Sequence, residues 1–320
     1  MRAKAGADRR WLWFALGALF FFGVTNFSLG FISEKSAGDP AASLEAAMIL
    51  WLGTGLLGIA GSACFLFSGR GFSGLPRRNS AFLPLAAGIT LALGMFLLKI
   101  SLAANALAKG PIVAIASSNS LVVALLAWVF LREKLSPGQL GSFLVIIAGI
   151  ILLSVGGTAG DNLDAVGYAV AAMLLLGLTN FLLKLAGEQG CDSITAAVLL
   201  WLAVGGCGVL AVAWHWLDKA RLPWLEPGGL SWLALLAGIF LALGMLLIKK
   251  SVTSGPAGPA TAVSGSNAIL VSLLDLVLLG HWLAPLKLVG MLAAVAGIVT
   301  LALARPLAKD RADVGGRNTV

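Results

Sequence analysis

Ten runs of about 20 predominantly apolar residues follow one another along the chain, and they restrict the possible folds more than any other feature. The runs lie near residues 11–31, 46–68, 81–102, 111–131, 139–156, 165–186, 194–216, 230–250, 259–279 and 286–304. Each can cross a hydrocarbon core of about 30 Å as a helix. Because the runs are continuously apolar and do not alternate, they predict helices rather than barrel strands. We expect an all-α membrane protein with ten transmembrane helices.

The composition excludes an ordinary soluble protein. Of the residues, 59% are hydrophobic and 11% are charged, whereas soluble domains carry about 25% charged residues. The net charge of +8 does not indicate a nucleic-acid partner, because the basic residues lie in short clusters at the ends of the apolar runs. The three cysteines are widely spaced, so neither a disulfide framework nor a metal site is predicted.

The chain repeats itself. GITLALGMFLLKIS at 88–101 recurs as GIFLALGMLLIKKS at 238–251, and GPIVAIASSNSLVVALL from Gly110 recurs as GPATAVSGSNAILVSLL from Gly258. The matches keep the same order, which chance apolar composition would not produce. The sequence therefore predicts two five-helix repeats at 11–156 and 165–304, with cytoplasmic tails at 1–10 and 305–320.

Five spans per repeat is an odd number, so the second copy must enter the membrane from the opposite side. The positions of lysine and arginine test this expectation, because cytoplasmic loops carry an excess of these residues. With the N-terminus inside, fifteen of the 22 lysines and arginines fall on inner positions, five on outer positions and two within spans. The bias favours two inverted five-helix repeats in the cytoplasmic (inner) membrane, with both termini in the cytoplasm.

Polar residues recur deep in the fourth and ninth predicted spans. Pro111 opens the fourth span, and eight residues further along, roughly 12 Å of helix, Asn119 lies near the bilayer centre. The candidate substrate-binding residues of these two spans are Ser117, Ser118, Asn119, Ser264, Ser266 and Asn267. They could line a polar cavity and bind substrate, or they could join packed helices by hydrogen bonds. The sequence leaves both interpretations open.

Asn26 and Asn180 occupy matching places in the first span of each half. Asn26 is predicted beyond the middle of its helix towards the outside, and Asn180 beyond the middle of its own towards the inside. We include both among the substrate-binding candidates. Capping a helix kink beside Thr25 or Thr179 is the alternative.

Ionisable residues within the spans are the candidates for ion coupling. Asp275 is the one carboxylate in a predicted span, which makes it the natural candidate for proton coupling, although it should approach the outer interface and could simply pair with a neighbour. Lys99 and Lys249 align across the repeats near helix ends. For these two lysines we favour extension towards the lipid headgroups.

These features resemble the EamA-type family of the drug/metabolite transporter superfamily. The closest stretch is LVVALLAWVFLREKLSPGQLGSFLVIIAGIILLS at 121–154, which carries Glu133-Lys134-Leu135. The second repeat has His281 where the first has Glu133. The resemblance implies ten spans, cytoplasmic termini, a central cavity between the halves, and export or import of small metabolites by alternating access.

The sequence thus predicts a secondary transporter for a small polar or amphipathic metabolite, with export the favoured direction. No enzyme motif, cofactor or metal site is expected. The expected partners are a small-molecule metabolite and membrane lipid, not nucleic acid. The sequence leaves open whether the protein forms a homodimer. The amides and hydroxyls of the predicted pathway suit a neutral or zwitterionic solute. The first alternative is a flippase for lipid or lipid-linked sugar, and the second is a non-transport membrane subunit or enzyme.

Overall fold

The computed structural model describes residues 10–36, 39–68, 81–105, 108–131, 136–155, 163–225, 229–254 and 263–303, and these residues form helices and short connections without a strand. The helices are α1 (Arg10–Lys35), α2 (Pro40–Phe67), α3 (Phe82–Ala104), α4 (Lys109–Ser117), α5 (Asn119–Phe130), α6 (Pro137–Val155), α7 (Leu163–Glu188), α8 (Ser193–Lys219), α9 (Gly229–Ser254), α11 (Asn267–Leu279) and α12 (Pro285–Leu303). Within these described residues, each of the ten predicted spans falls on helix. The predicted tails lie outside the described residues, apart from Arg10.

Within these described ranges, seven helical segments are long and apolar enough to cross a membrane, counting α4 and α5 as one. The other three predicted spans contain the shorter apolar segments Pro137–Leu153, Val263–Leu279 and Pro285–Leu301. Large apolar side chains are exposed along the helices, for example Ile59, Leu144, Leu210 and Val277. An apolar surface of this extent suits lipid and not water. The chain is an integral membrane protein.

Short polar residues set the starts of two long helices. The Asp39 carboxylate accepts a hydrogen bond from the backbone N–H of Ala41 (2.9 Å), and Pro40 opens α2. The Asp192 carboxylate accepts from the N–H groups of Ile194 (3.1 Å) and Thr195 (3.2 Å). The first N–H groups of a helix have no partner within the helix, so an acceptor before the first turn stabilises its start.

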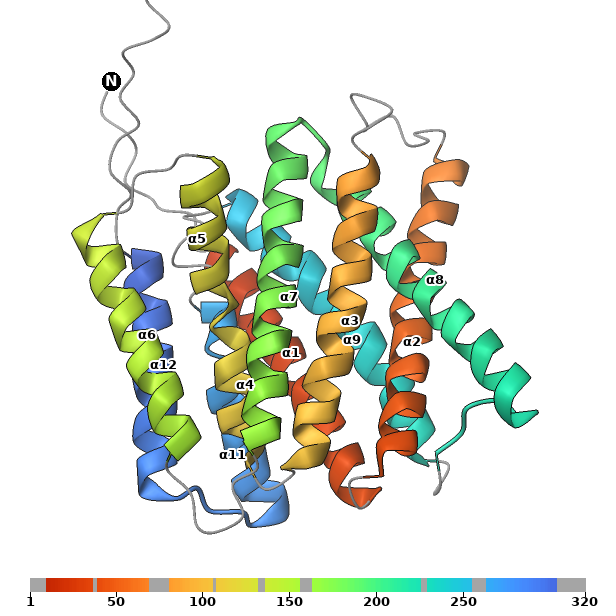
Figure 1. Cartoon of the computed structure of the whole chain (residues 1–320). Helices are drawn as coiled ribbons and strands as arrows, with labels where there is room; N and C mark the ends of the chain where they lie inside the picture. Colours follow the sequence, from red (N-terminus) through yellow and green to blue (C-terminus); the bar gives the residue numbers. More distant parts are fainter. Residues whose placement is uncertain are drawn as a thin grey trace, which may run out of the picture.

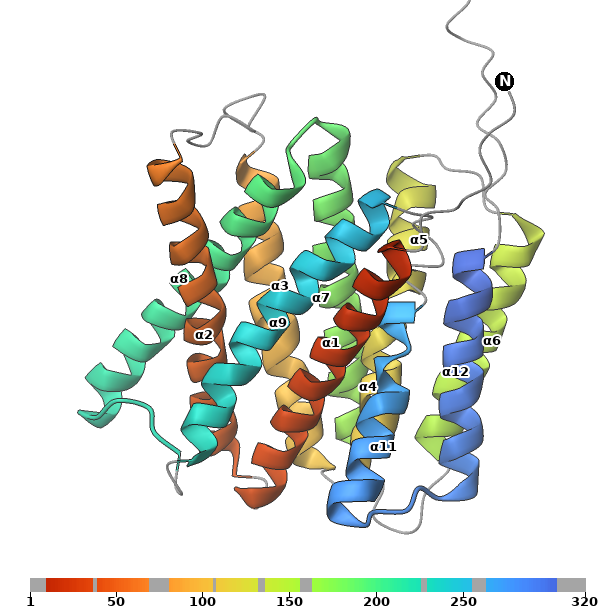
Figure 2. The ribbon, with the colours of Figure 1, turned by 180° about the vertical axis from the view of Figure 1, so that it is seen from behind.

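The helices form a layered bundle (Figure 1). α3 packs against α7 in one layer, and α1 packs against α9 in the layer behind it (Figure 2). The pair α6 and α12 lies at one edge and the pair α2 and α8 at the opposite edge, with α4, α5 and α11 in between. We call the lower end in Figure 1, where α1 ends, the Lys35 end, and the opposite end the Arg10 end.

Glycines allow the edge helices to approach closely. A Cβ atom added to Gly55 on α2 would lie 2.5 Å from the Cα atom of Gly205 on α8. A Cβ atom on Gly149 of α6 would lie 2.6 Å from the backbone nitrogen of Ala294 on α12. Without a hydrophobic driving force between helices in lipid, such backbone contact is a main source of packing energy.

Candidate functional site

Two of the central helical segments are interrupted at single serines. Ser118 separates α4 from α5 with φ −71° and ψ 8°, and Ser266 separates helical residues 263–265 from α11 with φ −77° and ψ 12°. A ψ near 0° departs from the α-helical value of about −42° and leaves carbonyl groups without their usual partners. At membrane depth such groups need other donors.

Asparagine side chains supply those donors. The Asn119 amide donates to the carbonyl oxygen of Ala116 (3.1 Å), and the Asn267 amide donates to the carbonyl oxygen of Ser264 (3.0 Å). Each asparagine is the first residue after its break and reaches back three residues. The two breaks therefore have the same local construction.

Each of these asparagines also bonds to an asparagine from the other half of the chain. The Asn26 amide on α1 donates to the Asn267 side-chain oxygen (3.1 Å), and the Asn180 amide on α7 donates to the Asn119 side-chain oxygen (3.2 Å). The Asn267 amide also donates to the Ser117 hydroxyl at 3.3 Å, which joins the two broken segments directly. All four predicted asparagines thus meet in two pairs.

Exposure differs between the two pairs. Asn26 and Asn267 are 9% and 5% exposed, whereas Asn119 and Asn180 are half-buried. Ser118 and Ser264 are buried, and the Ser118 hydroxyl donates to the carbonyl oxygen of Ala114 (2.9 Å). The other two predicted serines, Ser117 and Ser266, are half-buried.

The threonines beside the asparagines on α1 and α7 bond outside the amide pairs. The Thr25 hydroxyl donates to the carbonyl oxygen of Ala237 on α9 (3.2 Å), and the Thr179 hydroxyl lies 2.8 Å from that of Thr90 on α3. They therefore hold α1 against α9 and α7 against α3, which leaves the asparagines aimed at the breaks.

A second polar cluster lies at the Lys35 end. The Lys109 ammonium at the start of α4 donates to Asp275 on α11 (2.6 Å) and to Glu34 on α1 (2.8 Å). Lys109 is fully buried and Asp275 is 4% exposed in its side chain, while Glu34 and His281 are each 25% exposed. Lysine and aspartate are almost never buried unless they are paired, so the pair accounts for the burial of both.

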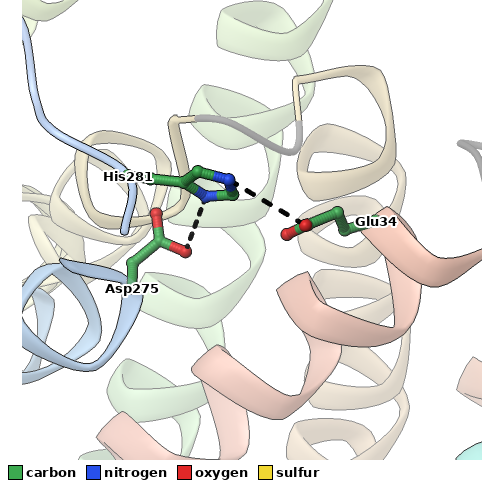
Figure 3. Close-up of side chains that lie close together, drawn as sticks. All are labelled: Glu34, Asp275 and His281. Atoms are coloured by element: carbon green, nitrogen blue, oxygen red, sulfur yellow. Dashed lines mark hydrogen bonds and ion pairs between the residues drawn. The ribbon is translucent and has the colours of Figure 1, made fainter. Parts of the chain in front are cut away.

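The end of α11 brings His281 to this cluster. Gly280 adopts a left-handed conformation (φ 72°), and the His281 N–H then bonds back to the carbonyl oxygen of Asp275 (3.4 Å). This turn places the His281 Nδ1 atom 3.4 Å from the Asp275 carboxylate and the Nε2 atom 4.0 Å from Glu34. Figure 3 shows the imidazole between the two carboxylates. We call Glu34, Lys109, Asp275 and His281 the ion cluster.

The donor set of the ion cluster resembles that of a metal site. Ligand atoms of Glu34, Asp275 and His281 all lie within 4.8 Å of one another. The Lys109 ammonium, however, already bonds to both carboxylates and provides the positive charge that a metal ion would bring. The arrangement therefore fits an internal ion pair better than a metal centre.

The predicted extension of Lys99 towards the lipid headgroups was wrong. Lys99 is fully buried and donates to the Ser33 hydroxyl on α1, so it does not extend to lipid headgroups. Lys249 is half-buried and donates to the carbonyl oxygen of Ser193 (3.2 Å) at the start of α8. Lys99, Lys249 and Asp275 do not converge on one site. Only Asp275 belongs to the ion cluster.

Another buried carboxylate holds the connection between α8 and α9 in place. Glu45 on α2 is 3% exposed, and its carboxylate accepts from Arg221 (2.6 Å) and from the backbone N–H of Trp224 (3.0 Å). His215 on α8 lies 3.6 Å from the same carboxylate. This cluster joins the start of α2 to the end of α8.

Sequence reasoning missed Glu34, Lys109 and His281. Lys109 lies between the third and fourth predicted spans, directly before Gly-Pro, but α4 begins at Lys109 itself. A signal was present: Asp275 is predicted near the outer interface, and Lys109 and His281 lie beside outer ends of predicted spans. Opposite charges at one depth could have suggested the pair.

Comparisons with known proteins agree with this architecture. Fifteen chains of solved structures match this chain. One, described only as the crystal structure of a protein, has 19% sequence identity and a TM-score of 0.60, and the match covers 93% of this chain and 97% of that one. At this identity the likeness shows the fold alone. No curated protein gives a significant match.

The family comparison concerns the second half of the chain. A family model described as the EamA-like transporter family matches residues 164–303, which run from the start of α7 to the end of α12. The matched segment contains Asn180, Asn267 and Asp275. Over its second half, this apolar helical chain therefore matches the EamA-like transporter family, which is part of the drug/metabolite transporter superfamily.

Proposed function

We propose that this protein is a secondary transporter that moves a small polar or amphipathic solute between two inverted five-helix repeats. The observation that carries the proposal is the amide pairing of Asn26 with Asn267 and of Asn180 with Asn119. Each pair joins the first span of one half to the interrupted span of the other half. Two repeats related by a two-fold axis in the membrane plane would produce this exchange.

Helix packing supports the same relation. α1 packs on α9 as α3 packs on α7, so the first span of each half contacts the third span of the other. α2 packs on α8 and α6 on α12, so the second and fifth spans each contact their own counterpart. An inverted duplication predicts both kinds of contact. The two third spans, α3 and α9, are also the helices whose sequences match at an offset of 150, at 88–101 and 238–251.

The four amides and the adjacent hydroxyls are well suited to bind a solute. Interrupted helices near the bilayer centre are a recurring place for substrate sites, because their free backbone groups can bond to a ligand. In this structure the amides bond to each other across the halves, so a solute with donors and acceptors could replace those bonds. The absence of charge among them favours a neutral or zwitterionic solute.

We further propose that the Lys35 end faces the outside and that the structure is closed there. The lysine and arginine bias favours a cytoplasmic position for both termini, which supports this orientation. The ion cluster joins α1, α4 and α11 at the Lys35 end, and the pair Asn26–Asn267 nearer to it is buried. The pair Asn119–Asn180, nearer to the Arg10 end, is half-buried. This difference suits a transporter that is closed to the outside.

The test is solute flux in proteoliposomes. A metabolite library is first screened for thermal stabilisation of the purified protein, and the compounds that bind are then measured for flux. The double variant Asn119→Ala with Asn267→Ala should lose both stabilisation and flux, whereas the matched control Asn105→Ala, at an asparagine that follows α3, should keep them. Full flux by the folded double variant would overturn the site assignment. Binding of lipid with no flux of any soluble compound would favour a flippase instead.

A further inference from the structure

The ion cluster joins both halves of the chain at a single end of the bundle. Glu34 and Lys109 come from the first half, and Asp275 and His281 come from the second. Lys109 is held in place by its surroundings, because a Cβ atom on Gly30 of α1 would lie 2.6 Å from the Lys109 side chain. Any movement that separates α4 from α1 and α11 at this end must break both lysine ion pairs.

The net charge of the closed ion cluster allows it to take up one proton. Glu34 and Asp275 carry two negative charges and Lys109 carries one positive charge, so a neutral His281 leaves the cluster at −1. An imidazolium at His281 would bring the cluster to zero and would face both carboxylates, at 3.4 Å and 4.0 Å. Once the helices separate, each group is hydrated alone and this benefit is lost. An imidazolium at His281 would therefore add ion pairs to the closed arrangement that the open arrangement lacks.

Three other lysines lie towards this end of the bundle, on α3, α1 and α12. On α3, Lys99 donates to the hydroxyl of Ser33, which directly precedes Glu34 on α1. On α1, Lys35 is exposed and lies 5.5 Å from the centre of the Phe31 ring. Lys287 lies in the first turn of α12, just after the connection that carries His281.

The corresponding positions of the other repeat lack these partners. The offset of 148 that relates Asn119 to Asn267 relates Lys109 to Ala257 and Asp275 to Ala127. The offset of 154 that relates Asn26 to Asn180 relates Glu34 to Glu188. Lysine and aspartate are both replaced by alanine, so the sequence does not repeat this lysine–aspartate pair in the other half.

We propose that the ion cluster is the outer gate of the transporter, and that one proton taken from the outer solution by His281 stabilises its closed state. The proposal rests on the transport function proposed above and names the proton as a ligand that biases the conformational change. Glu34 and His281 are each 25% exposed, so the solution at the Lys35 end can reach the proton-binding group. Lys109 and Asp275, which are buried, form the part of the gate that must separate.

The proposal can be tested by the accessibility of one engineered cysteine. Val271 is fully buried and lies one helical turn from both Asn267 and Asp275 on α11, directly between the amides and the gate. In a variant whose three native cysteines are replaced by serine, Val271→Cys is exposed to a membrane-impermeant maleimide added outside intact cells. Trp282→Cys, at a position 84% exposed beside the gate, corrects for the effect of pH on the thiol reaction and checks the orientation.

The corrected labelling rate of Val271→Cys should fall severalfold between external pH 8 and pH 5.5, because a proton that stabilises the closed state lowers the population of the open state. His281→Gln should remove this pH dependence. His215→Gln, at the other histidine of the chain, should keep it. Lys109→Gln, or Glu34→Gln if Lys109→Gln does not fold, should label rapidly at both pH values.

An unchanged pH dependence in His281→Gln would overturn the proposal, and so would labelling of Lys109→Gln or Glu34→Gln as slow as that of the parent protein. The assay needs no substrate, so it separates this proposal from the proposed transport function. No flux of any solute in proteoliposomes, together with the expected labelling response, would support the gate and contradict the transport proposal. Normal flux with no pH dependence of labelling would support transport and contradict the proton gate.

Discussion

Asn180 on α7 donates a hydrogen bond to the side chain of Asn119, the first residue of α5, over a distance of 3.2 Å. Asn26 and Asn267 repeat this bond at 3.1 Å with the roles of the two halves exchanged. Each bond connects a continuous helix to an interrupted one. The two bonds therefore hold the two halves in register near the centre of the bundle.

The two amide pairs should contribute unequally to stability. In a double-mutant cycle with alanine at Asn26 and Asn267, we expect a coupling free energy of about 0.6–1.7 kcal/mol, the range found for interhelical hydrogen bonds in membranes. The half-buried pair Asn119 and Asn180 should give less, because competing donors can reach it. Reversible unfolding in mixed detergent micelles measures both cycles. A larger coupling for the half-buried pair would contradict this ordering.

Close packing of α2 on α8 depends on Gly205. Its added Cβ would lie 2.6 Å from the Cα atom of Gly55, so Gly205→Val must push two backbones apart. Overpacking of this kind costs about 1–3 kcal/mol, which thermal unfolding should register as a lower melting temperature. Gly206→Val is the control, since no atom lies within 4 Å of its Cβ position. Equal losses in both variants would mean that helix propensity and not contact is responsible.

Glu45 should contribute more to the free energy of unfolding than a surface ion pair at the same end of the bundle. Glu45→Gln weakens the bonds to Arg221 and to the N–H of Trp224, and hydrogen bonds to a buried charged group contribute about 1.5–3 kcal/mol. The exposed pair of Asp218 and Lys219 provides the comparison, and Asp218→Asn should change the unfolding free energy by about 0–1 kcal/mol. Similar unfolding free energies for the two variants would contradict the assigned role of Glu45.

Gly30 should affect the gate through Lys109. Gly30→Ala places a methyl group against the Lys109 side chain and forces it from its preferred rotamer, at a cost of about 0.5–1.5 kcal/mol. The labelling rate of Val271→Cys should then rise roughly two- to tenfold at external pH 5.5. Gly167→Ala, at a position with no atom within 4 Å of the added Cβ, should leave the rate unchanged. A rate that does not respond to Gly30→Ala would argue against Lys109 as part of the gate.

The native cysteines should differ in reactivity. Burial raises the pKa of the Cys191 thiol above its usual value; the Lys249 ammonium opposes this shift and Asp192 adds to it. A raised pKa leaves less thiolate at pH 7.5, so Cys191 should be alkylated more slowly than the exposed Cys64 and should react faster as the pH rises. Mass spectrometry of peptides after timed alkylation measures both rates, with the denatured protein as the reference. Faster alkylation of Cys191 than of Cys64 at pH 7.5 would contradict the expectation.

Helix positions were predictable because apolar runs and their polar ends are local properties. The sequence predicted spans near 11–31 and 194–216, and the structure has α1 at Arg10–Lys35 and α8 at Ser193–Lys219. The broken segments were not predicted. Both begin as apolar runs with Gly-Pro before them, and the breaks at Ser118 and Ser266 depend on side-chain amides that replace backbone bonds.

The sequence by itself determined an integral membrane protein with ten apolar segments, an internal duplication, and asparagines at matching depths, because membrane insertion depends on composition and length along the chain. Only the tertiary structure decided which residues meet. It paired Asn26 with Asn267 across 241 positions and Lys109 with Asp275 across 166. Such contacts depend on how helices from opposite halves cross, and no local pattern specifies a crossing. The burial of Lys99 and Lys109 was missed for the same reason: a lysine near a helix end can reach the headgroups unless neighbouring helices enclose it.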